Sequence, residues 1–151
     1  MNSPGILRVA LLAFLPISEV RGALPYGVFV EKLPLSLVIS VAFVSNIVPF
    51  FLVMYALPLL VRLFLRLKWF NNLWQWYTQK AQSRFSSYRR YGKWGILFFV
   101  GIPLPFTGMW TGALVSFLAG FKTWEIFPFT VGGVALATFL VSFLVLLGKT
   151  F

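Results

Sequence analysis

The chain has 151 residues, of which 60% are hydrophobic and 11% charged, and its mean hydropathy is +0.89. These values lie outside the range of soluble domains and predict an all-α integral membrane protein. Cysteine and histidine are absent and only three acids accompany thirteen Lys and Arg residues, which excludes disulfides, thiolate metal sites and His-based catalytic triads. We therefore expect neither an enzyme nor a bound metal or cofactor.

The first apolar segment, residues 5–32, is interrupted near its middle in the stretch LPISEVRGALPYG. Pro16, Gly22 and Pro25 are expected to break a helix there. The pieces on either side of the break are about half a bilayer long. This pattern predicts a re-entrant hairpin, which enters and leaves the membrane on the same side.

The interrupted stretch also carries two charges, Glu19 and Arg21. A charge at the membrane centre costs about 2.5–3.5 kcal/mol on insertion scales, so such charges usually face a cavity or a partner. Positions two apart fall on one side of an extended tip but point apart on a helix. Arg21 suits a phosphate or carboxylate, and a desolvated Glu19 can carry a proton. The alternative is a structural ion pair that pins the hairpin, and both roles can coexist.

Two further segments are predicted to span the membrane. Residues 35–61 and 126–147 are each long enough to cross a hydrocarbon core of ~30 Å. Asn46 lies in the middle of the first of them, where we expect either a structural role or a hydrogen bond to a tip.

The central stretch, residues 65–93, is rich in Lys and Arg and contains no acid. Cytoplasmic loops of membrane proteins collect such cations, so we place this linker in the cytoplasm. Aromatic residues recur in it at three- and four-residue spacing, which predicts a basic amphipathic helix on the membrane surface. Binding to nucleic acid is not expected from this distribution of charge.

The second interrupted segment, residues 94–121, contains the stretch GIPLPFTGMWTGAL. Its breaks are expected at Pro103, Pro105, Gly108 and Gly112. The two glycines also form a GxxxG pattern, which can equally serve close helix packing.

Two hydroxyl groups, from Thr107 and Thr111, lie on the approach to the half-helix that follows these breaks. The free N–H groups and the positive dipole end of that half-helix would favour an anion. We therefore add both threonines and Gly108 to Glu19, Arg21, Gly22 and Asn46 as candidate site residues.

The two halves of the chain share one plan, an interrupted segment followed by a spanning helix. We divide a single membrane domain into a first repeat (1–64), the linker (65–93) and a second repeat (94–151). If both interrupted segments are re-entrant, each half crosses once and the second half is inverted, with the two tips meeting near the midplane. Paired interrupted segments point to a transporter site. The alternative fold is a bundle of four kinked transmembrane helices.

The motif residues resemble the small multidrug export protein family, a branch similar to the DedA (VTT) membrane proteins. The resemblance implies paired re-entrant loops in an inverted repeat. For the DedA relatives it also implies lipid translocation, including recycling of undecaprenyl phosphate, with essential acid and arginine residues and proton coupling. Those relatives carry an arginine in the second motif as well, whereas the second tip here has none. The resemblance is carried by Pro16, Glu19, Arg21, Gly22, Pro25 and Gly27, and by Pro103, Pro105, Thr107, Gly108, Trp110, Thr111 and Gly112.

Three functions remain open from the sequence. The first is proton-coupled translocation of an amphipathic anion, such as a polyprenyl phosphate or a phospholipid, in the plasma (inner) membrane of a prokaryote. The second is proton-coupled export of lipophilic cationic drugs, with Glu19 as the binding residue. The third is a non-transporting scaffold or assembly factor. Two crossings per chain are few for a lipid-sized path, so we expect a homodimer.

Overall fold

The computed structural model describes residues 3–64, 72, 75–76, 89–104 and 107–150, in which the regular secondary structure is helical with no strand. The predicted all-α fold is confirmed for this part of the chain. The first half contains α1 (Ser3–Phe14), α2 (Glu19–Pro25), the π-helix η1 (Tyr26–Val30), α3 (Leu35–Phe51), the π-helix η2 (Leu52–Ala56) and α4 (Leu57–Phe64). The second half contains α6 (Arg89–Gly101), α7 (Met109–Leu118) and α8 (Thr123–Thr150).

Two long apolar helices form the frame of the molecule. Helices α3, η2 and α4 join into one 30-residue helix, Leu35–Phe64, with a mean hydropathy of 2.4 over an 18-residue stretch. The second, Thr123–Lys149, has 27 residues and a mean hydropathy of 2.3 over an 18-residue stretch. Both are long enough to cross a membrane. The predicted spans 35–61 and 126–147 are therefore confirmed as helices, each a few residues longer than the hydropathy indicates.

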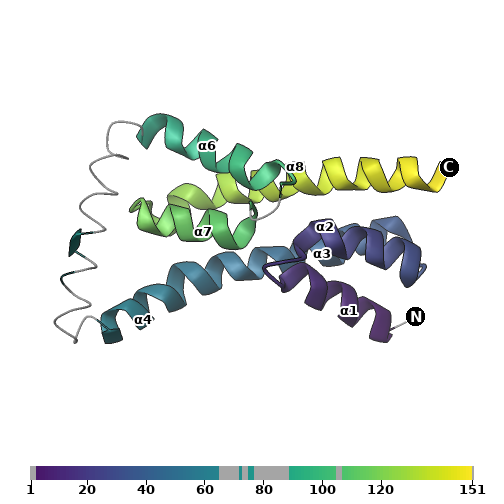
Figure 1. Cartoon of the computed structure of the whole chain (residues 1–151), viewed down its shortest axis with the longest axis horizontal. Helices are drawn as coiled ribbons and strands as arrows, with labels where there is room; N and C mark the ends of the chain where they lie inside the picture. The colour runs from purple at the N-terminus through teal and green to yellow at the C-terminus, as the bar shows by residue number, and fades with distance from the viewer. Residues whose placement is uncertain (1–2, 65–71, 73–74, 77–88, 105–106, 151) are drawn as a thin grey trace.

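Each long helix is preceded by a helical hairpin. In the first, α1 ends at Phe14, a turn containing Pro16 follows, and α2 with η1 runs back along α1. In the second, α6 ends at Gly101, a non-helical segment containing Pro103 follows, and α7 runs back. Figure 1 shows that the hairpins approach from opposite ends of the molecule and that their tips meet in the middle. Both ends of the chain lie at one end, and the end of α4 lies at the other.

Close packing at small residues holds these hairpins against the long helices. A Cβ added to Gly27 would lie 2.6 Å from the Val38 side chain, so α3 passes directly over the first hairpin. A Cβ added to Gly133 would lie 2.7 Å from the Leu97 carbonyl oxygen, so α6 and α8 touch backbone to backbone. Apolar packing without large side chains at the contact is typical of helices in membranes.

Three of the predicted helix breaks, Gly22, Pro25 and Gly112, lie inside helices. Pro25 is the last residue of α2, and the helix continues into η1 without a turn because the wider π-helical winding accommodates the missing proline N–H. Gly112 lies within α7, where its lack of a side chain makes room for Val100. Pro105 and most of the basic linker, including its predicted amphipathic helix, lie outside the described residues.

Candidate functional site

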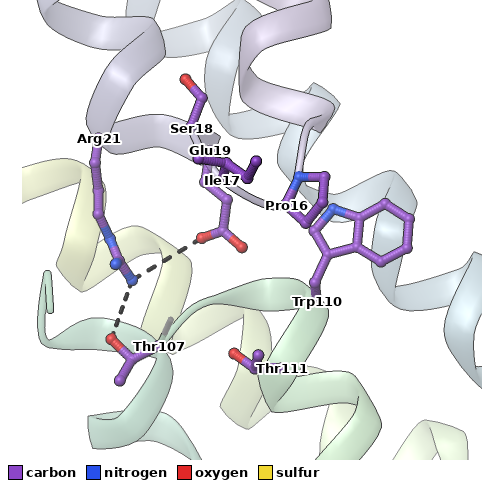
Figure 2. Close-up of a pocket in the computed structure, with 8 residues that line it drawn as sticks. All are labelled: Pro16, Ile17, Ser18, Glu19, Arg21, Thr107, Trp110 and Thr111. Carbon is purple, nitrogen blue, oxygen red and sulfur yellow. Dashed lines mark hydrogen bonds and ion pairs between the residues drawn. The ribbon is translucent and has the colours of Figure 1, made fainter. Parts of the chain in front are cut away.

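A cavity of about 210 Å³ lies where the two hairpin tips meet (Figure 2). The first hairpin lines it with Pro16, Ile17, Ser18, Glu19 and Arg21, and the second with Thr107, Trp110 and Thr111. Four of the seven candidate site residues therefore line one cavity. The sequence pattern missed Pro16 as a lining residue, and it missed Ile17, Ser18 and Trp110 altogether as site residues.

The Glu19 carboxylate is buried and lies at the N-terminus of α7. Its residue is 5% exposed, and the backbone N–H groups of Met109 and Trp110 face the carboxylate. These N–H groups belong to the first turn of α7, where no partner within the helix exists. The anion position expected at this half-helix is thus taken by a side chain of the protein itself.

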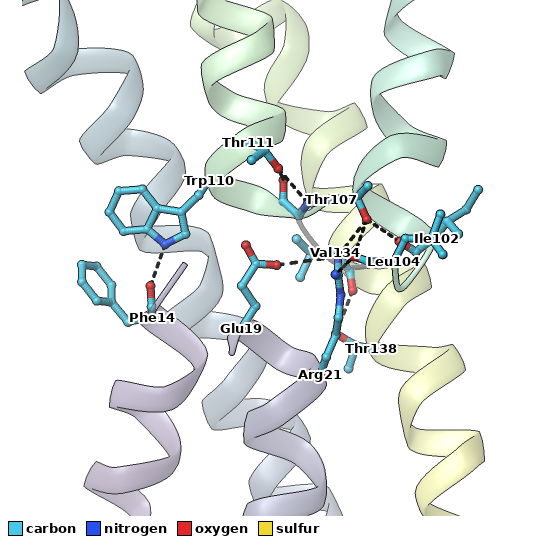
Figure 3. Close-up of polar contacts among 11 residues, drawn as sticks. Phe14, Glu19, Arg21, Ile102, Leu104, Thr107, Trp110, Thr111, Val134 and Thr138 are labelled. Atoms are coloured by element: carbon cyan, nitrogen blue, oxygen red, sulfur yellow. Dashed lines mark hydrogen bonds and ion pairs between the residues drawn. The ribbon is translucent and has the colours of Figure 1, made fainter. Parts of the chain in front are cut away.

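Glu19 also has an unusual backbone conformation, since its φ of +49° lies in the left-handed region. That conformation is uncommon for a residue with a side chain and costs of order 1–3 kcal/mol. It turns the chain from the Pro16 turn into α2 and aims the carboxylate at the second hairpin (Figure 3). The residue with the strained backbone, Glu19, is therefore also the only acid among the described residues that line the cavity.

Arg21 connects the first hairpin to the second. Its Nη2 lies 3.9 Å from Glu19 Oε2 and donates a hydrogen bond to Thr107 Oγ1 at 3.1 Å, while Nη1 donates to the Leu104 carbonyl oxygen. Its Nε is buried and has no hydrogen-bond acceptor among the described residues. Arg21 and Glu19 are therefore close but not tightly paired, and each binds mainly to the second hairpin.

The two threonines fix the backbone of the second tip. Thr107 Oγ1 lies 2.8 Å from the Ile102 carbonyl oxygen and 2.9 Å from that of Leu104. Thr111 Oγ1 accepts a hydrogen bond of 3.0 Å from the Gly108 N–H. Gly108 packs against the Glu19 carboxylate with no room for a Cβ, so it brings the backbone of this tip up to the acid.

Trp110 makes the reciprocal contact, from the second hairpin to the first. Its indole Nε1 donates a hydrogen bond of 2.7 Å to the carbonyl oxygen of Phe14, the last residue of α1 (Figure 3). The Phe14 and Trp110 rings also pack edge to face, with centroids 5.5 Å apart. A tryptophan N–H in an otherwise apolar broken segment is the feature of the sequence that could have predicted this role.

The other three candidate residues, which are Gly108, Gly22 and Asn46, are not among the residues that line the cavity. Gly22 lies in α2, where a Cβ would collide with Ser18 Oγ, so its role is packing. Asn46 is buried in α3 at 1% exposure, and its Oδ1 has no hydrogen-bond partner among the described residues. No hydrogen bond from Asn46 to a tip is seen in this part of the chain.

Two further ion pairs lie away from the cavity, one within the first half of the chain and one between α6 and the first turn of α8. Arg8 Nη1 is 3.0 Å from Glu31 Oε1 in the first half, and Lys93 Nζ is 2.5 Å from Glu125 Oε1 in the second. The hydrogen bond from Arg8, and then one of 2.9 Å from the Tyr26 hydroxyl, lower the pKa of Glu31 below its usual range. Each of the three acids of the chain therefore has a cation within 3.9 Å, although Glu19 and Arg21 are not hydrogen-bonded to each other.

The described residues contain no cluster of three His, Cys, Asp or Glu side chains that could hold a metal ion. Large apolar side chains instead cover much of the outer surface, including Leu7 and Phe139, which are 61% and 69% exposed. A soluble monomer rarely exposes so much apolar surface. Together with the two long apolar helices, this surface defines the class as an all-helical membrane protein with a buried acid and arginine at its centre.

Within that class the family can be named. The model of the family described as "Putative small multi-drug export protein" matches residues 19–140, so the chain belongs to this family. The match begins at Glu19, directly after the Pro16 turn, and includes the second tip. Searches of curated proteins and of solved structures give no match. The expected resemblance to this family is thus confirmed, and a multidrug-export type of transporter is the function that the family's description suggests.

Proposed function

We propose that this chain is a proton-coupled transporter of an amphipathic anion, such as a polyprenyl phosphate or a phospholipid. The observation that carries the proposal is the central cavity, in which the tips of two hairpins bring Glu19, Arg21 and Thr107 together inside an apolar molecule. Polar groups within a membrane protein usually mark a substrate or proton pathway.

The proposal includes a re-entrant inverted repeat like that of the DedA proteins. Helix α1 has 12 residues and α7 has 10, so they extend only about 18 Å and 15 Å and are too short to cross the membrane. The tips meet in the middle of the molecule, where non-helical backbone is tolerated only if it is buried or lines a cavity. These lengths support re-entrant hairpins rather than four kinked spanning helices.

The charges of the cavity favour an anionic substrate. Arg21 keeps its charge at any physiological pH. With Glu19 ionised the pair is neutral overall, and with Glu19 protonated the site carries a net positive charge. An anion is attracted to the second state, whereas a cation in a cavity of this size would lie close to Arg21 in either state.

The position of Glu19 suggests how a proton could be coupled. The ionised carboxylate occupies the N-terminus of α7, which is itself an anion-binding position. A protonated Glu19 binds there less strongly, so the N-terminus and Arg21 become available to the anionic head of the substrate. Proton and anion would then enter the site together and leave it together.

A reconstituted transport assay tests this proposal. Liposomes would receive a fluorescent lipid phosphate in one preparation and a lipophilic cationic dye in another. Arg21→Lys should lower transport of the lipid phosphate by roughly tenfold, because lysine keeps the charge but loses the two-pronged donor. Glu19→Gln should remove the dependence on a proton gradient. Arg8→Lys is the matched control, because Arg8 pairs with Glu31 away from the cavity.

Export of lipophilic cations is the rival that the family description favours. In that case the dye should be transported, Glu19→Gln should abolish its binding, and Arg21 should tolerate a neutral replacement. Such a result would overturn the proposal for an anion and keep the cavity as the site.

A scaffold is the second candidate, favoured by the bonding of Arg21 and Trp110 across the two tips. It predicts no transport of either probe. It also predicts that Glu19→Gln or Arg21→Gln alone lowers thermal stability and that the double variant recovers it, because the uncompensated charge is then removed. We further propose a homodimer, since two long helices per chain enclose little volume.

A further inference from the structure

An apolar groove of about 300 Å³ lies next to the polar cavity and shares two residues with it. One wall is a single face of η2 and α4, and the other is a face of α7. The shared residues are Trp110 and Thr111. The groove is otherwise lined by Leu52, Val53, Ala56, Leu57, Leu60 and Leu114.

We infer that this groove binds the hydrocarbon chain of the transported anion while the polar cavity holds its head. This inference rests on the proposed function and adds the part of the site that recognises the apolar end of the substrate. Trp110 is the wall between the two parts, with its indole N–H bonded to the first hairpin and its ring lining both spaces.

The chemistry of the lining fits one occupant. All lining side chains other than Thr111 are apolar or aromatic, and the Thr111 hydroxyl is already bonded to Gly108. None of the described residues that line the groove is charged, whereas Glu19 and Arg21 line the adjoining cavity. A ligand that fills both spaces therefore has a charged end and a hydrocarbon end.

The dimensions agree with a chain that lies within one leaflet. The lining residues of the first wall run from Leu52 to Leu60, which corresponds to about 12 Å along a helix. Half of a hydrocarbon core is about 15 Å. Leu52 and Leu60 are 44% and 51% exposed, so the groove is open along its side to lipid. A chain can therefore enter from the bilayer without leaving hydrocarbon.

The local backbone also supports a binding function. The wall is formed in part by η2, a π-helix that interrupts an otherwise α-helical span. Such π-turns are rare and occur frequently at functional sites. Here η2 presents Leu52, Val53 and Ala56 to the groove, directly opposite the helix whose N-terminus faces Glu19.

Photo-crosslinking in liposomes tests this inference. The probe is dodecyl phosphate with a diazirine at the end of its chain, and the labelled positions are mapped by mass spectrometry. We expect labels to concentrate in residues 52–60 and at Leu114. Unlabelled dodecyl phosphate at ten times its dissociation constant should reduce labelling about tenfold. Dodecanol and dodecyltrimethylammonium should not, because they lack the anionic head.

A pair of tryptophan variants sharpens the test. Ala56→Trp fills the groove and should abolish the labelling, whereas Leu59→Trp should leave it unchanged because Leu59 lies on the same helix, 69% exposed and outside the lining. If Ala56→Trp does not fold, the competition between unlabelled dodecyl phosphate and the probe on the unmodified chain still tests the inference. Labels spread over lipid-facing residues such as Phe139, or equal competition by dodecanol or the ammonium compound, would overturn the inference.

The outcome separates this inference from the proposed function. If unlabelled dodecyl phosphate reduces labelling of the groove but no transport is measured, the transport proposal is wrong and the groove remains a binding site for an anionic amphiphile. If lipid phosphate is transported in a way that depends on Glu19, but unlabelled dodecyl phosphate does not reduce labelling of the groove, the proposed function stands. The inference that the groove binds the hydrocarbon chain is then overturned.

Discussion

The contact between Gly108 and Glu19 shows how a single residue controls the central site. Gly108 has an extended backbone, with a φ of −179°, which any residue can adopt. Its requirement for glycine is therefore one of space, because a Cβ would occupy the position of the Glu19 carboxylate. Without that close approach, the N–H groups of α7 would lie too far away to stabilise the buried charge.

A first prediction follows for Gly108→Ala. The added methyl group should destabilise the protein by about 1–3 kcal/mol through overpacking, measured by thermal unfolding in detergent. Gly95→Ala is the control, because Gly95 lies in α6 with no atom within 4 Å of the added Cβ, and it should stabilise by up to about 1 kcal/mol. Combining Gly108→Ala with Glu19→Ala should give a smaller loss than the sum of the two. If Gly108→Ala and Gly95→Ala changed the stability equally, the close contact between Gly108 and Glu19 would be contradicted.

A second prediction concerns Glu31, whose pKa is lowered by its hydrogen bonds from Arg8 and then Tyr26. A lowered folded-state pKa means that the stabilisation is complete above the unfolded value of about 4.3 and is lost as the pH falls through the folded value. The melting temperature of the unmodified chain should therefore exceed that of Glu31→Gln at pH 7, and this difference should shrink below about pH 4. A difference that stays constant with pH would show that Glu31 acts by packing alone.

At the scale of the helices, each hairpin donates a hydrogen bond to a backbone carbonyl group of the other hairpin. Phe14 is the last residue of α1, so its carbonyl has no partner within the helix, and Trp110 supplies one. Leu104 follows α6 in a non-helical segment, and Arg21 supplies a donor to its carbonyl. In surroundings without water such groups must be paired within the protein. The two hairpins therefore stabilise each other's ends.

A third prediction tests this mutual bonding. Trp110→Phe keeps an aromatic ring and removes the N–H, so it should destabilise the protein by about 0.5–1.5 kcal/mol, or more if the Phe14 carbonyl stays buried without a partner. Thermal unfolding in detergent measures the change. Trp124→Phe is the matched control, because that tryptophan is 70% exposed on α8. A loss as large in the control would show that ring size matters and the hydrogen bond does not.

The helix boundaries also show which features the sequence could predict. The long helices follow from local hydropathy, and α3 begins where expected because Pro34 is extended and cannot continue a helix from the preceding segment. Pro25 was expected to end a helix, yet the chain continues through it into η1. Whether a proline ends a helix or only widens it depends on packing with distant segments, which a local pattern does not contain.

At the scale of the whole molecule, the partners in the site come from distant parts of the sequence. Arg21 bonds to a carbonyl 83 residues away, and Trp110 to one 96 residues away. The sequence predicted Glu19, Arg21, Thr107 and Thr111 as site residues because charges and hydroxyls are rare in apolar segments. It could not predict that Glu19 itself would occupy the N-terminus of α7, since that depends on how the hairpins dock.

The last prediction concerns how the chain crosses the membrane, where the two possible architectures give opposite results. Re-entrant hairpins add no net crossing, so with the basic linker in the cytoplasm the end of α8 reaches the outside face. Four full crossings would return it to the cytoplasm. The positions of the end of α8 and the end of α4 at opposite ends of the molecule support the first architecture (Figure 1).

A single cysteine placed in this cysteine-free chain can distinguish these architectures. Lys149→Cys, at the exposed end of α8, should react with a membrane-impermeant maleimide added to intact cells. Asn72→Cys, in the linker, should react only after the membrane is permeabilised. Protection of both cysteines in intact cells would contradict the re-entrant arrangement. It would also contradict the cavity between two hairpin tips, because α1 and α2 would then have to form one continuous crossing instead of a hairpin.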